Sequence, residues 1–126
     1  MAILLAGLVP VSAGLAGALT GFGFLGQSLP AAADSHARYL SGLLLGIGLG
    51  VWWCALALDR RQAVFGALCA LVAIGGLARL GGLLHGVPPL PHLLALVMEL
   101  GVTPALWAWS HRLHGTVAKA ATRPHP

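Results

Sequence analysis

Two charged residues stand inside apolar stretches of this 126-residue chain, Arg79 in "GGLARLGG" and Glu99 in "LVMELGV". Arg79 lies six residues before His85, and Glu99 lies seven residues after His92. The histidines bound a proline-rich loop that cannot continue a helix. If the loop joins two antiparallel helices, a rise of about 1.5 Å per residue places both charges roughly 9–10 Å from it. Matching depth predicts an ion pair, which lowers the cost of each charge in an apolar environment.

A second pair of charges occurs in "ADSHARYLSG", residues 33–42. Asp34 or Ser35 is expected to cap a helix that begins near residue 37. Arg38, one turn further on, is expected to reach Asp34 or to turn toward Arg79.

The last apolar stretch carries a polar face, because the spacing i, i+7 and i+11 places His92, Glu99 and Thr103 on one side of a helix. Pro104 follows and should bend that helix, freeing the carbonyl group of Leu100. These observations predict a buried polar cluster, or a ligand-binding site, at the loop ends of the helices. Its predicted members are Asp34, Arg38, Tyr39, Arg79, His92, Glu99 and Thr103.

Three kinds of chemistry are open to this cluster. The charges can be structural pairs. The two arginines can instead hold the carboxylate or phosphate of an amphiphile, although the four charged residues sum to zero and can satisfy one another. Glu99 can also carry protons within a membrane. Catalysis would need a nucleophile or a base in reach, and none is spaced for it, so we predict no catalytic residue and no enzyme.

Histidine and cysteine do not form a metal-ligand pattern. The six histidines lie at segment ends or in the tail, and Cys54 and Cys69 lie within apolar stretches. Histidines at an interface, without a carboxylate or thiolate set, are typical of polar anchors rather than of zinc or haem sites. We therefore predict no metal and no cofactor.

The elements that position these residues follow from composition. Hydrophobic residues make up 58% and charged residues 8%, whereas soluble domains are about 25% charged. Four stretches approach the ~20 residues that a membrane-spanning helix needs, and only helices satisfy their own backbone there. The predicted fold is all-α, a polytopic membrane protein with a four-helix bundle in residues 1–112 and a basic tail in 113–126. The predicted helices are 2–26, 37–58, 62–84 and 93–110.

The basic residues predict the orientation of these helices. Arg60, Arg61, Arg112, Lys119 and Arg123 lie on one side and Arg38 on the other. The positive-inside rule then places both termini in the cytoplasm. Tryptophans are expected to anchor the same helix ends at the membrane interface, and these are Trp52, Trp53, Trp107 and Trp109.

Glycines recur at helical spacing and predict close helix packing. One face carries Gly42, Gly46 and Gly50, and another carries Gly75 and Gly82 beside Arg79. We expect these faces to pack inside the bundle, with a dimer interface as the alternative.

Four stretches resemble an uncharacterised family of small bacterial membrane proteins, domain of unknown function 4345. They are "DSHARYLSGLLLGIGL" (34–49), "GGLARL" (75–80), "GVPP" (86–89) and "LVMELGVTPALWAW" (96–109). The resemblance runs in order over most of the chain and implies a four-helix membrane bundle in the bacterial inner membrane. It carries over Asp34, Arg38, Arg79, Glu99 and Pro104 as pattern positions. Gly81 and "LDRR" (58–61) depart from the family pattern. The resemblance implies no particular reaction.

Small size, glycine faces and little soluble mass favour a non-enzymatic accessory or scaffold subunit of a larger membrane complex. The alternative is a binder or carrier of a lipid or quinone-like amphiphile. It would bind at the polar cluster described above, which the predicted orientation places on the outer side of the membrane. The expected partners are membrane lipids and other membrane protein subunits. Nucleic acid is not expected, because the basic residues lie at segment ends rather than in a patch.

Overall fold

The computed structural model describes residues 1–21, 23, 26 and 29–121, and the side chains among them as far as residue 112. In this part of the chain the only regular structure is helical, and four helices are long and apolar enough to cross a membrane. These spans are Ala2–Thr20, Ala31–Ala55, Leu58–His85 and Leu90–Arg112. The predicted all-α fold with four membrane-spanning helices is confirmed. The predicted end of the tail, residues 122–126, lies outside the described residues.

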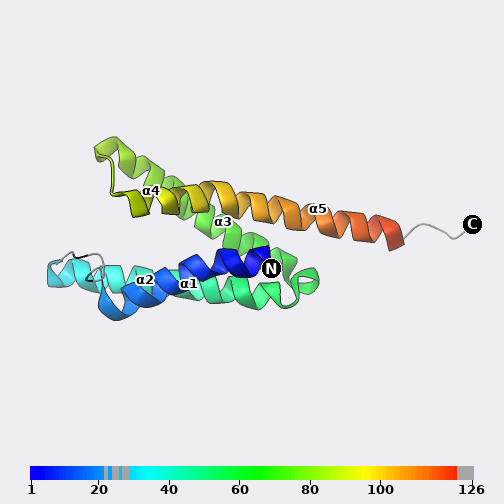
Figure 1. Cartoon of the computed structure of the whole chain (residues 1–126), viewed down its shortest axis with the longest axis horizontal. Helices are drawn as coiled ribbons and strands as arrows, with labels where there is room; N and C mark the ends of the chain where they lie inside the picture. The colour runs from blue at the N-terminus through cyan, green and yellow to red at the C-terminus, as the bar shows by residue number, and fades with distance from the viewer. Residues whose placement is uncertain (22, 24–25, 27–28, 122–126) are drawn as a thin grey trace, which may run out of the picture. The chain divides into compact units, whose positions relative to one another are not determined.

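The first half of the chain is a hairpin of α1 (Ala2–Thr20) and α2 (Ala31–Ala55), which lie side by side in Figure 1. Helix α1 ends at Gly21, whose φ of +60° is a conformation that favours glycine. Helix α2 begins directly after Pro30, six residues before the predicted start at 37. The segment "AAA" at 31–33 joins the helix because alanine has the highest helix propensity.

The early start of α2 overturns the predicted helix cap. Asp34 lies in the first turn of the helix rather than before it, and no side chain caps this end. A carboxylate in the first turn still interacts favourably with the helix dipole.

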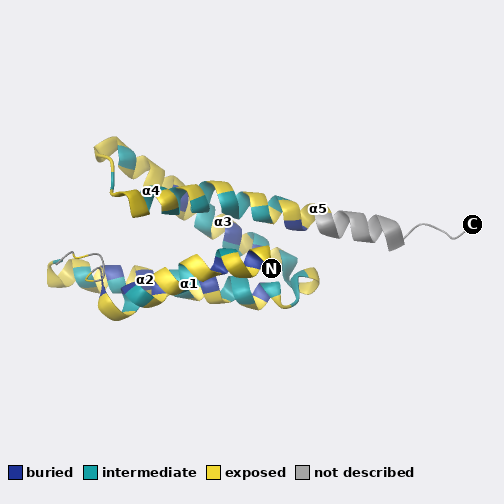
Figure 2. Ribbon diagram, viewed as in Figure 1, coloured by how far each residue is buried: buried dark blue, intermediate teal, exposed yellow. Residues whose placement is uncertain are grey.

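The two helices of this hairpin meet through glycines. A Cβ atom added at Gly14 would lie 2.5 Å from the backbone nitrogen of Leu45, and one added at Gly48 would lie 2.9 Å from that of Val11. Both glycines are buried, as Figure 2 indicates for this interface. The backbones can approach this closely only because neither glycine carries a side chain.

The second half of the chain is a hairpin with an irregular returning arm. Helix α3 (Leu58–Gly82) continues into a 3₁₀ turn, η2 (Leu83–His85). The chain returns through α4 (Leu90–Val97), a π-helical turn η3 (Met98–Val102) and α5 (Thr103–Ala121). Helix α5 thus extends beyond the predicted end at residue 110, into the segment predicted as a tail.

The charged segment Asp59–Arg61, which the sequence places between the second and third predicted helices, instead occupies the first turn of α3. Its residues are helical because the backbone nitrogens of Arg60 and Arg61 both bond to the carbonyl oxygen of Ala57. Arg61 departs from helical geometry, with φ −116° and ψ 17°, so the turn is kinked.

Helix α3 carries one large buried side chain and, nearer the loop, a glycine that contacts the returning arm. Phe65 is 2% exposed and is the largest fully buried residue described. Nearer the loop, a Cβ added at Gly76 would lie 2.9 Å from the Cβ of Glu99. Helix α3 therefore lies directly against the returning arm beside Glu99. The two hairpins form separate compact units that divide after Leu56.

Candidate functional site

In the second hairpin the predicted ion pair between Arg79 and Glu99 is present. Nε of Arg79 donates to Oε2 of Glu99 at 3.0 Å, and Nη2 donates to Oε1 at 3.1 Å. The Arg79 side chain is 38% exposed and that of Glu99 is 17% exposed. Two parallel hydrogen bonds make this the strongest geometry available to an arginine and a carboxylate. Both carboxylate oxygens accept from the same guanidinium in a closed pair of two hydrogen bonds, while three further N–H groups of Arg79 lie outside this pair.

Glu99 stands in an irregular part of its helix, the π-helical turn η3. The backbone N–H and the hydroxyl group of Thr103 both donate to the carbonyl oxygen of Met98, the hydroxyl at 2.9 Å. This i to i−5 pattern ends just before Pro104, which lacks an N–H and whose ring crowds the carbonyl group four residues back. A π turn thus precedes Pro104, while the predicted bend and the predicted free carbonyl group of Leu100 remain predictions. π turns within α-helices occur often at functional sites.

His92 lies near the loop end of the same hairpin, in the first turn of α4. Its Nδ1 atom is buried and has no hydrogen-bond partner in the described structure. Its backbone nitrogen bonds to the carbonyl oxygen of Pro89 at 2.9 Å. The predicted polar face of the returning arm thus contains one closed ion pair, one hydroxyl engaged by its own helix and one unpartnered ring nitrogen.

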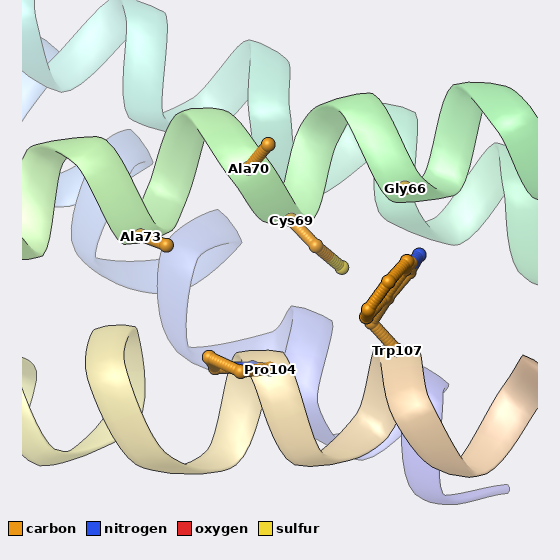
Figure 3. A pocket seen from close by; sticks show the side chains of 6 residues that line it. All are labelled: Gly66, Cys69, Ala70, Ala73, Pro104 and Trp107. Carbon is orange, nitrogen blue, oxygen red and sulfur yellow. The ribbon is translucent and has the colours of Figure 1, made fainter.

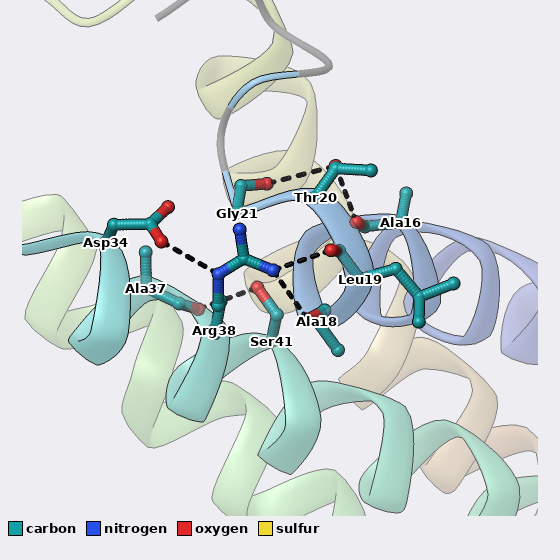
Figure 4. Close-up of polar contacts among 9 residues, drawn as sticks. All are labelled: Ala16, Ala18, Leu19, Thr20, Gly21, Asp34, Ala37, Arg38 and Ser41. Atoms are coloured by element: carbon teal, nitrogen blue, oxygen red, sulfur yellow. Dashed lines mark hydrogen bonds and ion pairs between the residues drawn. The ribbon is translucent and has the colours of Figure 1, made fainter. Parts of the chain in front are cut away.

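The second predicted pair belongs to the first hairpin. Nε of Arg38 donates to Oδ2 of Asp34 at 2.8 Å, one turn away on α2 (Figure 4). Nη1 of the same guanidinium donates to the carbonyl oxygens of Ala18 and Leu19, in the last turn of α1. Those carbonyls have no partner within their own helix. Arg38 therefore joins the end of α1 to the start of α2 and turns to Asp34, one of its two predicted partners.

Gly21 makes room for this arrangement. A Cβ atom added there would collide with the carboxylate of Asp34 and would lie 3.5 Å from Nη2 of Arg38. The backbone requirement for a positive φ and the steric requirement of the ion pair thus fall on the same residue.

Tyr39, the remaining member of the predicted cluster, is exposed on α2, and its ring stacks on that of His36 with centroids 6.4 Å apart. The described contacts among the members of the predicted cluster therefore lie within one hairpin or within the other. A single joint site that contains all seven residues remains a prediction.

Four of the five glycines predicted for packing do not make contacts within the hairpins. A Cβ atom added at Gly42, Gly46, Gly75 or Gly82 would meet no atom of its own hairpin within 4 Å, and Gly50 is half-buried. The hairpin contacts are made by Gly7, Gly14, Gly48, Gly66 and Gly76. The predicted glycines would then pack against a helix outside their own hairpin, and this role remains a prediction.

Of the predicted interface anchors, Trp53, Trp107 and Trp109 expose 41–50% of their surface. Trp52 is half-buried, and its indole N–H donates to the carbonyl oxygen of Leu4 at 2.9 Å. This bond links α2 to α1, a role that sequence reasoning missed.

Sequence reasoning also missed an apolar cavity in the second hairpin, about 220 Å³ in volume. Figure 3 shows Cys69 of α3 directed toward the indole of Trp107 on α5, with Pro104 further along the same helix. We call it the α3–α5 groove; its lining residues are Gly66, Cys69, Ala70, Ala73, Pro104 and Trp107. Small residues at 66, 70 and 73 recur at helical spacing and were the signal that could have predicted it.

The family comparison covers both hairpins. Residues 1–110 match the family described as Domain of unknown function (DUF4345), so the chain belongs to that family. No curated protein and no solved structure was found to match the chain. The resemblance inferred from the sequence motifs is thereby confirmed.

Proposed function

We propose that this protein is a non-enzymatic accessory or scaffold subunit of a larger membrane complex. We place it in the bacterial cytoplasmic membrane, with both termini in the cytoplasm. The placement rests on the excess of arginine and lysine at one set of helix ends. The partners are other membrane-spanning subunits and the surrounding lipids.

The proposal rests mainly on four glycines that lie on faces turned away from the partner helix of their own hairpin. Gly42 and Gly46 on α2, and Gly75 and Gly82 on α3, leave open space next to their hairpins. In lipid, helix association is driven by close packing at small residues rather than by apolarity. Each face is therefore suited to receive a further helix.

The closed ion pairs support a structural role for the charges. Both oxygens of Glu99 accept from Arg79, and Arg38 is shared between Asp34 and two backbone carbonyl groups. An anionic head group at this cluster would meet guanidinium groups whose charge is already matched by a carboxylate. This argues against the alternative, an amphiphile carrier at the outer cluster, and against proton transfer by Glu99.

The test is mass spectrometry of the protein extracted gently at native abundance, with proteins and small molecules identified together. The proposal expects defined partner subunits at fixed stoichiometry. Gly46→Leu should lower the recovery of the partner, because the added side chain fills the space that the incoming helix needs.

Ala13→Leu is the matched control, because Ala13 is exposed on α1 and lies outside the glycine faces. It should leave partner recovery unchanged. Thermal unfolding of each purified variant separates loss of a partner from loss of the fold. Recovery of the protein without any partner subunit, from cells that contain it at native abundance, would contradict the proposal.

A further inference from the structure

In each hairpin one tryptophan lies against a glycine of the facing helix. A Cβ added at Gly7 would lie 2.5 Å from Nε1 of Trp52, and one added at Gly66 would lie 2.9 Å from Nε1 of Trp107. Trp52 donates its indole N–H to the carbonyl oxygen of Leu4. The indole N–H of Trp107 has no acceptor in the described structure. Tryptophan N–H groups usually have a partner where the ring is packed, so the second hairpin lacks an acceptor that the first one provides.

The unpartnered N–H stands at one end of the α3–α5 groove. The groove follows α3 from Gly66 to Ala73, which is about 10 Å along the helix axis. Its wall is formed by methyl groups, a thiol and a proline ring, and Figure 3 shows Cys69 pointing from α3 toward the indole of Trp107. The indole donor is thus at the end nearer the start of α3, and apart from the Cys69 thiol the remainder is apolar.

The position of the groove determines what can fill it. Its lining residues all lie within two of the membrane-spanning segments. An apolar cavity of about 150 Å³ already stays dry and takes up an apolar ligand, and this one is larger. Ala70 and Trp107 are exposed, so the groove opens on the surface of the hairpin. The material that borders such an opening in a bilayer is the hydrocarbon chain of a lipid.

We propose that the α3–α5 groove binds one acyl chain of a membrane phospholipid, with the ester carbonyl group of that chain accepting the indole N–H of Trp107. Trp107 lies five residues before the end of its span, about 7.5 Å along the axis. That depth suits the ester region, just below the head groups, where tryptophan is enriched. From there the chain extends past Cys69 and Ala73 toward the ring of Pro104. The lipid belongs to the leaflet at which α3 begins.

The experiment is native mass spectrometry of the full chain in micelles, after delipidation and titration with a phosphatidylethanolamine that carries a diazirine in one acyl chain. The wild type should retain one phospholipid. Irradiation should label Cys69 or Ala73 more than the exposed Ala67, with each labelled residue assigned by fragmentation of the peptide.

One substitution tests the apolar groove and a second tests the indole N–H group. Ala73→Leu fills the groove and should remove the retained lipid. Trp107→Phe keeps an aromatic ring but removes the N–H, and it should weaken binding by about 2- to 10-fold. Ala67→Leu and Trp109→Phe change the same residue types at exposed positions outside the groove, and both should bind like the wild type.

Equal retention in all five proteins would overturn the proposal. So would retention of the free diazirine fatty acid in preference to the phospholipid, because the ester and the membrane lipid would then not be what is recognised. A change of oligomeric state in Ala73→Leu without loss of lipid would mean that a second copy of the chain fills the groove, and would also overturn it. Trp107→Phe keeps the test decisive if Ala73→Leu does not fold.

Discussion

Arg79 and Glu99, twenty residues apart in the sequence, face each other across the second hairpin through two parallel hydrogen bonds of 3.0 and 3.1 Å. One partner comes from α3 and the other from the π turn of the returning arm. The pair therefore joins the two arms beside Gly76, where a Cβ atom added on α3 would lie 2.9 Å from the Cβ of Glu99.

We predict that Arg79→Gln destabilises the protein by about 2.5–3.5 kcal/mol, the cost of one uncompensated charge in the membrane interior. The measurement is equilibrium unfolding in bicelles. The double variant Arg79→Gln, Glu99→Gln should lose less stability than the two single variants added together, because no unpaired charge remains.

Arg60→Gln is the control for that pair, since Arg60 is exposed in the first turn of α3. It should change the free energy of unfolding by less than about 0.5 kcal/mol. Strict additivity of the Arg79 and Glu99 variants would mean that the pair contributes nothing to stability.

We predict opposite effects for two glycines of the first hairpin. Gly14→Ala places a methyl group 2.5 Å from the backbone of Leu45 and should lower stability by about 1–3 kcal/mol, since the helices must separate. Gly42→Ala meets no atom of its hairpin, and it should be neutral or stabilising by up to about 1 kcal/mol, because alanine is the better helix former. Thermal unfolding of the purified variants measures both. Equal losses would show that the glycine contact does not hold this hairpin together.

We predict that Arg38→Gln frays the end of α1, because the carbonyl groups of Ala18 and Leu19 lose a charged donor. Hydrogen bonds to charged groups contribute about 1.5–3 kcal/mol each at most, and the partial exposure of Arg38 places the loss toward the lower value. Hydrogen exchange of the last turn of α1 should become faster, while exchange in α3 stays unchanged. Unchanged exchange at both places would exclude this role for Arg38.

We predict that Thr103→Val destabilises the π turn by about 1 kcal/mol, since the hydroxyl group that donates to the carbonyl oxygen of Met98 is lost. Thr103→Ser keeps that donor and should retain most of the stability. Equilibrium unfolding of both variants is the measurement. A loss as large in the serine variant as in the valine variant would point to packing of the methyl group instead.

The number and approximate position of the spans followed from the sequence, because about 20 consecutive apolar residues have few ways to satisfy their backbone in a membrane other than a helix. The Arg79–Glu99 pair followed as well. Two charges placed symmetrically about one short loop come to equal depth in any antiparallel hairpin, and each charge costs too much to be left alone.

Other features needed the tertiary structure. Glycines at helical spacing lie on several faces of α2 and α3, and spacing alone does not say which face meets a neighbour; Gly48 and Gly76 do so, whereas Gly42 and Gly75 do not within their hairpins. The start of α2 at Ala31 reflects a competition between alanine propensity and capping that the sequence left open. The α3–α5 groove exists only because α3 presents small residues where α5 presents Pro104 and Trp107. Sequence determined which residues must avoid lipid, and tertiary packing decided which partners they meet, because contact depends on helix rotation and distance, which local patterns do not encode.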